Sequence, residues 1–140
     1  EYLDSEKFQI RRRDWSAPGN LNADLTTLNA LRRAHHALQL ADNLAFHEAE
    51  NEAMLWYSKR GTDPHTSLLI AVNLDPHHAQ ETMVHVPLEL LGLDETTPFA
   101  VEDLLTGEHY TWRGRRNYVR LDPADRVGQI FRLWAASTPA

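Results

Sequence analysis

The spacing of the apolar residues changes once along this chain, and this change restricts the possible folds more than any other feature of the sequence. Before residue 40 the apolar side chains recur at steps of three and four, which places them on one face of a helix. The spacing predicts an amphipathic helix from about residue 21 to residue 39, with the side chain of Asn20 accepting a backbone N–H bond at its start. The stripe consists of Leu21, Leu25, Leu28, Leu31, His35 and Leu38.

After residue 42 apolar residues alternate with polar ones, which is the period of a β-strand. The continuous apolar run 68–72 predicts a strand in the centre of a sheet, and residues 88–93 predict a helical turn between strands. Many short strands separated by turn residues predict a mainly β fold class, an antiparallel β-sandwich preceded by one amphipathic α-helix. The other predicted strands are 53–57, 82–86, 99–101, 110–112, 118–121 and 129–133.

Composition argues against several classes of protein. A chain of 140 residues with 42% apolar and 24% charged residues has room for one domain and is not typical of disorder. A net charge of -6 disfavours a nucleic-acid or anionic membrane surface. The sequence has no Cys, and no apolar run approaches the roughly 20 residues of a membrane span. We therefore expect a cytoplasmic protein without disulfides that binds neither nucleic acid nor membrane.

Histidine pairs raise the question of a metal site. His35 and His36 are adjacent on the predicted helix, about 100° apart around its axis, so they cannot both bind one ion. We expect one to face inward and one outward. His77 and His78 follow a turn at Asp75, and a zinc site requires three or four convergent ligands that this spacing does not supply. The sequence therefore predicts no metal and no cofactor.

Two arginine-rich runs are candidates for anion binding. Residues 11–13 are all Arg, and Arg113, Arg115 and Arg116 surround a glycine. Forked guanidinium groups at the second run could hold a phosphate or an anionic sugar. We favour a charged hairpin tip with Gly114 in the turn, because the whole chain is acidic.

Residues 1–8 are densely polar and aromatic. We interpret them as the last piece of an active-site wall whose other pieces lie upstream, so we expect the chain to be a part of an enzyme and to be inactive alone. By themselves, the carboxylates Glu1, Asp4 and Glu6 are typical of a solvated helix start, and Lys7 is typical of a surface cation.

Five short motifs, in order, resemble one enzyme family. Together they are similar to the alpha-1,4-glucan:maltose-1-phosphate maltosyltransferases of the alpha-amylase superfamily, over nearly the whole chain. The resemblance implies that residues 1–41 are the last loop and helix of a (β/α)8 catalytic barrel and that residues 42–140 are the C-terminal β-sandwich domain. The motifs are EYLDSEK at 1–7, NLDPHH at 73–78, DLLTG at 103–107, WRG at 112–114 and NYVRLDP at 117–123.

The resemblance also implies an activity. The family transfers a maltosyl unit from alpha-maltose 1-phosphate to the non-reducing end of an alpha-1,4-glucan, with retention at the anomeric carbon. Retention uses two carboxyl groups about 5 Å apart, and by resemblance these lie on earlier barrel strands, so we expect no catalytic residue in this chain. Lys7 matches a Lys that hydrogen-bonds sugar hydroxyls. Phe8 stands where relatives have Tyr, and it keeps the stacking face but loses the hydroxyl.

Several alternatives remain open. The chain could be a carbohydrate-binding or interaction module, which would expose two aromatic rings side by side, or the C-terminal domain of another amylase-superfamily enzyme such as a trehalose synthase. We expect Trp56 in the core and Trp15 against the barrel, whereas Trp112 and Trp134 suit either core or surface. Without the barrel, the leucine stripe would fold back on the sandwich, be swapped in a homodimer, or be mobile.

Overall fold

The computed structural model describes residue 10 and residues 12–136. Its N-terminal elements are helix α1 (Asn22–Ala34) and the 3-10 helix η1 (His36–Leu38). The rest of the described chain is mainly β, with the 3-10 helix η2 (Pro64–Thr66) and the short helix α2 (Leu88–Leu91) inserted between strands. The strands are β1 (Leu44–Phe46), β2 (Met54–Lys59), β3 (Leu68–Asn73), β4 (Gln80–His85), β5 (Phe99–Asp103), β6 (His109–Trp112), β7 (Arg116–Leu121) and β8 (Gly128–Ala135).

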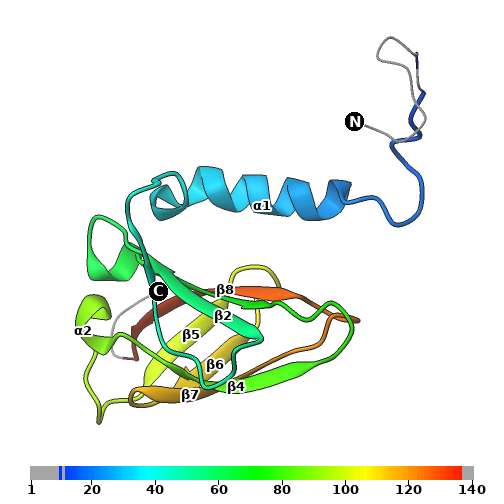
Figure 1. The fold of residues 1–140 in the computed structure, drawn as a ribbon. Helices are drawn as coiled ribbons and strands as arrows, with labels where there is room; N and C mark the ends of the chain where they lie inside the picture. The colour runs from blue at the N-terminus through cyan, green and yellow to red at the C-terminus, as the bar shows by residue number, and fades with distance from the viewer. Residues whose placement is uncertain (1–9, 11, 137–140) are drawn as a thin grey trace.

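The strands form two antiparallel sheets, which confirms the predicted sandwich. In the described residues the larger sheet has six strands in the order β1-β2-β3-β8-β5-β6, and the smaller consists of β4 and β7. Strand β3 lies between β2 and β8, as the apolar run at 68–72 predicted. Figure 1 shows the small sheet against one face of the large sheet, while α1 crosses the opposite face.

The main core lies between the two sheets, because alternate residues of each strand point into the same space. Strand β2 buries Met54, Trp56 and Ser58 and leaves the residues between them half-buried. Trp56 lies in the core, as predicted, in contact with the ring of Phe131 at 6.1 Å between centroids. Its indole N–H donates to the carbonyl oxygen of His85 at 2.9 Å, so the bond connects the large sheet to the small one.

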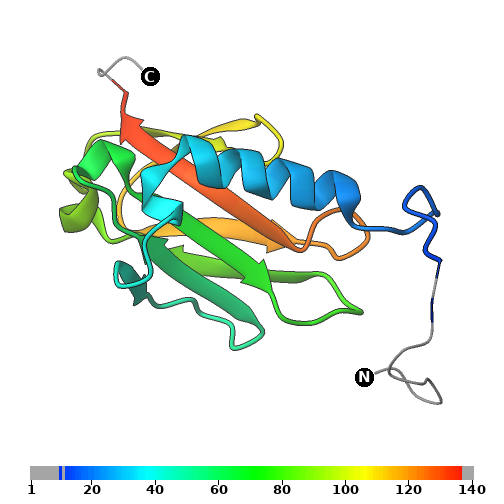
Figure 2. The same ribbon diagram turned by 90° about the horizontal axis from the view of Figure 1, so that it is seen from above.

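A second, smaller core lies on the outer face of the large sheet. Leu68, Ile70 and Ile130 point there from β3 and β8, and Ala37 of η1 covers them. Leu31 of α1 packs against the same cluster. Viewed from above, α1 lies over β8 (Figure 2). The end of α1 is therefore attached to the sandwich by apolar contacts.

The first helix is shorter than predicted. It ends at Ala34 because His35 has an extended backbone, with φ -120° and ψ 107°, and the chain continues as the separate turn η1. At the other end, Asn20 Oδ1 accepts the N–H of Asn22 at 2.9 Å, which is the predicted bond, but the residue at the N-cap position is Leu21, whose side chain makes no capping bond. None of the helices in the described residues is long and apolar enough to cross a membrane.

Two further features differ from the predictions. Strand β1 was not predicted, because its three residues are all exposed and show no alternation of burial. The predicted hairpin at 113–116 is wrong: β6 pairs with β5 in the large sheet, whereas β7 pairs with β4 in the small one. The arginine-rich loop therefore passes from one sheet to the other, with Gly114 in the left-handed region at φ 66°.

Candidate functional site

The predicted sugar-binding residues cannot be placed. Lys7 and Phe8 lie outside the described residues, as do the carboxylates Glu1, Asp4 and Glu6. Their predicted roles stay predictions.

Helix α1 presents most of its leucine stripe to solvent. Leu21, Leu25 and Leu28 are 63%, 52% and 44% exposed, whereas Leu31 is half-buried against the sandwich. Within the described residues, only the C-terminal end of the stripe packs against the sandwich. Trp15 precedes the helix and is also exposed. We call the three exposed leucines, Leu21, Leu25 and Leu28, the leucine row. An exposed apolar row of this kind is suited to packing against another domain or chain.

The histidine pairs do not converge on an ion. His35 is half-buried and His36 is exposed, so the prediction of one inward and one outward side chain is confirmed. At the second pair, Asp75 Oδ1 accepts the backbone N–H groups of His77 and His78 at 2.9 and 3.2 Å. These bonds, led by the His77 N–H and joined by Gln80, lower the pKa of Asp75 to about 2. The described part of the chain contains no cluster of three or more side chains suited to a metal.

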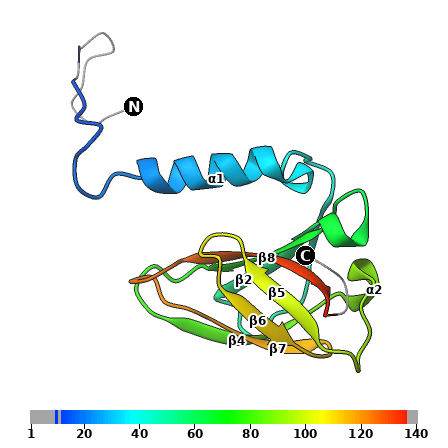
Figure 3. The same ribbon diagram turned by 180° about the vertical axis from the view of Figure 1, so that it is seen from behind.

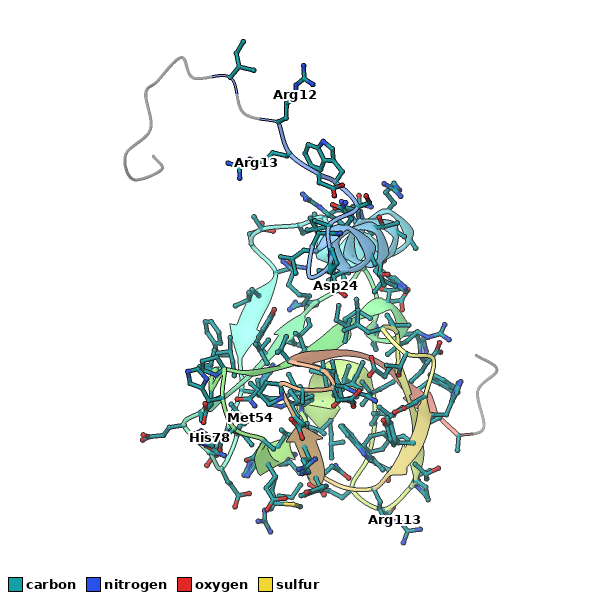
Figure 4. The ribbon with its side chains drawn as sticks, turned by 90° about the vertical axis from the view of Figure 1, so that its right-hand side faces the viewer. Arg12, Arg13, Asp24, Met54, His78 and Arg113 are labelled. Atoms are coloured by element: carbon teal, nitrogen blue, oxygen red, sulfur yellow. The ribbon has the colours of Figure 1, made fainter. Side chains whose placement is uncertain are left out.

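The arginine-rich loop is held by carboxylates. Arg115 binds Glu89 of α2 at 2.5 Å (Nη2 to Oε1), and its Nε lies 3.3 Å from Glu95. Arg116 forks onto Glu50 through two hydrogen bonds of 2.8 Å. These guanidinium groups therefore connect surface segments of the sandwich. Figure 4 shows Arg113 at the end of the molecule opposite to Arg12 and Arg13, so the two basic runs do not meet.

A buried carboxylate organises a further polar cluster. Asp103 is 0% exposed, at the end of β5. Its Oδ1 accepts the N–H of Leu105 at 2.9 Å, and its Oδ2 lies 3.2 Å from Arg126 Nη1 and 3.3 Å from Gln129 Nε2. Arg126 also binds Glu108, which raises the pKa of the guanidinium and lowers that of the Glu108 carboxyl. Asp103 and Arg126 thus join the β5–β6 turn to the segment before β8.

A cleft of about 380 Å³ lies beside the segment that joins η1 to β1. A neighbouring hollow of about 200 Å³ shares Arg60, Gly61 and Leu90 with it. Hydrogen bonds hold the turn along the hollow: Asp63 accepts the N–H of His65 at 2.9 Å, and Thr66 completes a capping box. The lining of both hollows lacks an aromatic ring on which a sugar could stack.

The outer face of the small sheet carries a hydrogen-bonded polar surface around one ring. Tyr118 of β7 is 54% exposed, and its hydroxyl donates to Glu81 of β4. Beside it, His85 Nε2 lies 2.9 Å from Glu50 Oε2, the same carboxylate that Arg116 binds. The fork from Arg116, and to a lesser extent the bond to His85, lower the pKa of Glu50 to about 2. Residues 118–121 were predicted as a strand and as part of the motif at 117–123, but neither pattern indicated this surface.

Trp112 and Trp134 lie on opposite faces of the large sheet. Trp112 points between the sheets, 5.2 Å from the Phe131 ring centroid, and is partly buried. Trp134 is half-buried on the other face of the large sheet, with the Arg132 guanidinium carbon 4.9 Å from its ring centroid. Each side chain therefore already has a partner within the sandwich.

A family model described as "GLGE, C-terminal" matches residues 46–133, which cover most of the sandwich. The chain belongs to the GLGE C-terminal family. This GLGE C-terminal domain is 40% identical over 139 residues to an alpha-1,4-glucan:maltose-1-phosphate maltosyltransferase of Cereibacter sphaeroides, which covers 99% of the chain. It is 44% identical over 145 residues to alpha-1,4-glucan:maltose-1-phosphate maltosyltransferase 2 of Streptomyces coelicolor, which covers 100% of the chain. The resemblance carried by the five motifs is thereby confirmed.

The GLGE C-terminal chain spans 21% of the length of each of these two relatives. Among solved structures, an alpha-amylase from Geobacillus thermoleovorans in complex with acarbose matches 89% of the chain with a TM-score of 0.65 at 15% identity, over 25% of its own length. At this identity the match concerns the fold alone. It confirms the predicted amylase-type β domain.

Proposed function

We propose that this chain is the C-terminal part of a retaining maltosyltransferase that moves maltosyl units from alpha-maltose 1-phosphate to the non-reducing end of alpha-1,4-glucans. The observation that carries the proposal is the 40–44% identity to enzymes of that name over 99–100% of the chain. Their shared name favours this activity over that of a trehalose synthase. A cytoplasmic location and a homodimer belong to the same proposal.

In this proposal the catalytic carboxylates belong to another part of the enzyme. Retaining transfer requires two carboxyl groups about 5 Å apart on either side of an open sugar site. The acidic clusters of the described residues do not meet this requirement: Asp103 is buried, and Glu50 and Glu108 are each occupied by an arginine. These carboxylates of the sandwich are therefore not the pair that carries out the transfer.

Residues 1–41 would form the junction with the catalytic barrel. The leucine row supports this role, because its side chains are 44–63% exposed while the next leucine, Leu31, packs on the sandwich. Burying such side chains against a barrel contributes roughly 1–2 kcal/mol each. Lys7 and Phe8 would then reach a sugar subsite at the edge of that barrel.

The proposal is tested by a chimera. In the Streptomyces coelicolor relative, the matching fifth of the protein is replaced by this chain, and phosphate release from alpha-maltose 1-phosphate is measured with maltohexaose as the acceptor. We expect turnover by the chimera and none by the 140-residue chain alone. Turnover by the chain alone would contradict the proposal that the catalytic carboxylates lie in another part of the enzyme. A folded but inactive chimera would contradict the assigned activity.

The sugar subsite is tested within the same chimera. Lys7→Ala removes up to three hydrogen-bond donors, so we expect kcat/KM to fall at least tenfold. Phe8→Tyr restores the hydroxyl that the family resemblance implies at this position, and we expect it to lower KM. Arg12→Ala serves as the matched control, because it removes a nearby cation that the proposal does not use. Equal effects of Lys7→Ala and Arg12→Ala would contradict the subsite.

A further inference from the structure

We propose that the outer face of the small sheet binds an alpha-1,4-glucan chain, with the ring of Tyr118 as its stacking surface. The choice of sugar rests on the function proposed above, whereas the assignment of the face rests on its geometry. This contact lies on the sandwich and involves other residues than the subsite predicted at Lys7 and Phe8.

The face consists of alternate residues of the two strands. Tyr118 lies directly opposite Met83, and the neighbouring cross-strand pairs on the same face are His85 with Arg116 and Glu81 with Arg120. Strands rise about 3.3 Å per residue, so the row from Arg116 to Arg120 is about 13 Å long. The ring is therefore centred in a strip that is long enough for a short oligosaccharide.

No other described element covers this strip. Figures 1 and 3 show α1 on the opposite side of the molecule, with the large sheet between it and strands β4 and β7. Tyr118 is 54% exposed, on the face of the small sheet that points away from the core. The ring is thus accessible to a ligand without any rearrangement of the backbone.

The polar groups around the ring are already held in place. The Tyr118 hydroxyl donates to Glu81, and the Arg116 fork fixes Glu50 with two bonds of 2.8 Å. Asn51 donates to the carbonyl oxygen of Glu81 at 3.0 Å, which fastens the preceding loop to β4. Groups that are fixed before binding lose little conformational entropy when a ligand binds. Less of the free energy of a weak contact is therefore lost to ordering the protein.

The charges of the strip favour a neutral ligand. Arg116 is paired with Glu50, and Arg120 lies 3.8 Å from Asp122 and opposite Glu81. Because the charges are paired locally, the strip attracts neither a polyanion nor a polycation strongly. An aromatic face bordered by carboxylate and guanidinium groups offers stacking together with hydrogen bonds to hydroxyl groups. This combination suits a polyhydroxylated neutral chain.

Another exposed aromatic residue shows the contrast. Phe46 of β1 is 66% exposed, but its ring packs against Tyr57 at 6.0 Å between centroids, and the nearby Leu44 is also exposed. Within the described residues, no side-chain hydrogen bond joins Tyr57, the cross-strand partner of this ring, to a neighbouring carboxylate, whereas the Tyr118 hydroxyl donates to Glu81. Phe46 is therefore a matched control for Tyr118, since both are exposed strand aromatics of the same chain.

The test is native gel electrophoresis of the 140-residue chain with and without glycogen in the gel. We expect glycogen to retard the chain, Tyr118→Ala to weaken the apparent affinity at least fivefold, and Phe46→Ala to leave it within twofold. Tyr118→Phe keeps the ring and is expected to bind within threefold of the original chain. Circular dichroism of each variant verifies that the fold is intact.

Three outcomes would overturn the inference: no retardation by glycogen, equal losses for Tyr118→Ala and Phe46→Ala, or retardation by heparin in place of glycogen. Glycogen binding that persists in 0.5 M NaCl would support a neutral ligand, because ionic contacts weaken with salt. An inactive chimera combined with Tyr118-dependent glycogen binding refutes the proposed activity and leaves this site intact. An active chimera whose isolated chain ignores glycogen refutes this site alone.

Discussion

Arg126 Nη1 lies 3.2 Å from Asp103 Oδ2, and the carboxylate that it binds is completely buried. Asp103 is the last residue of β5, and Arg126 precedes β8. Strands β5 and β8 are neighbours in the large sheet. A buried carboxylate that loses its cation is costly, because the charge remains without solvent. The pair therefore contributes to the stability of the sandwich without requiring a role in chemistry.

Replacing Arg126 should reveal this contribution. We expect Arg126→Met to lower the free energy of unfolding by roughly 3 kcal/mol, since it leaves Asp103 buried with only Gln129 and a backbone N–H as partners. Urea denaturation at pH 7 measures the change. The control is Arg120→Met, which removes an exposed partner 3.8 Å from Asp122 and should cost less than about 0.5 kcal/mol. Similar losses in both variants would contradict the assigned role of the buried pair.

The two parts of the leucine stripe should respond differently to truncation. Leu31 packs on the second core, so Leu31→Ala should destabilise the chain by about 1–2 kcal/mol, less than for a fully buried leucine. Leu25 is 52% exposed, and Leu25→Ala should change stability by less than about 0.5 kcal/mol. Thermal unfolding of the 140-residue chain compares the two. A larger loss for Leu25→Ala would show that the leucine row is covered in solution.

Gly61 should not tolerate a side chain. A Cβ built there would lie 2.1 Å from Thr66 Oγ1 and 2.6 Å from the carbonyl carbon and oxygen of Thr66. Because backbone atoms cannot move aside as a side chain does, we expect Gly61→Ala to cost about 2–3 kcal/mol in urea unfolding. Gly107→Ala is the comparison: its φ of 78° imposes strain of about 1 kcal/mol, but no atom lies within 4 Å of the new Cβ. The reverse order of losses would rule out the steric explanation.

Stability should depend on pH through His35. Burial lowers the pKa of His35, and the charge of Arg132 adds to this effect while Glu102 opposes it. The folded state therefore holds the neutral ring, and between the folded pKa and the unfolded value near 6.5 the unfolded state binds more protons. The contribution of His35 is present above about pH 6.5 and is lost as the pH falls through this window.

Unfolding by urea at pH 5 and pH 7.5 measures this contribution. His35→Gln should show a smaller loss of stability at pH 5 than the original chain, whereas His36→Gln, at an exposed position, should keep the full loss. Part of the dependence should remain in His35→Gln, because burial also lowers the pKa of His47. An unchanged dependence in His35→Gln would disprove the contribution.

Much of the fold was predictable because burial alternates along most strands. The run at 68–72 and the alternation at 129–133 predicted β3 and β8, and the turn at 88–93 proved to be α2. Strand β1 was missed because all three residues of this short edge strand are exposed, so burial does not alternate along it. The site at Lys7 and Phe8 depended on family resemblance alone, since a lone lysine beside an aromatic ring has many possible roles.

The sequence by itself determined where the helix and most strands lie and which of their faces are apolar, because these properties repeat over a few neighbouring residues. Only the tertiary structure decided which elements meet. Trp112 and Asn117 are five residues apart, yet their strands belong to different sheets. Arg116 binds Glu50, which lies sixty-six residues away in the sequence. Such pairings depend on how both sheets close over one core, which no local pattern encodes.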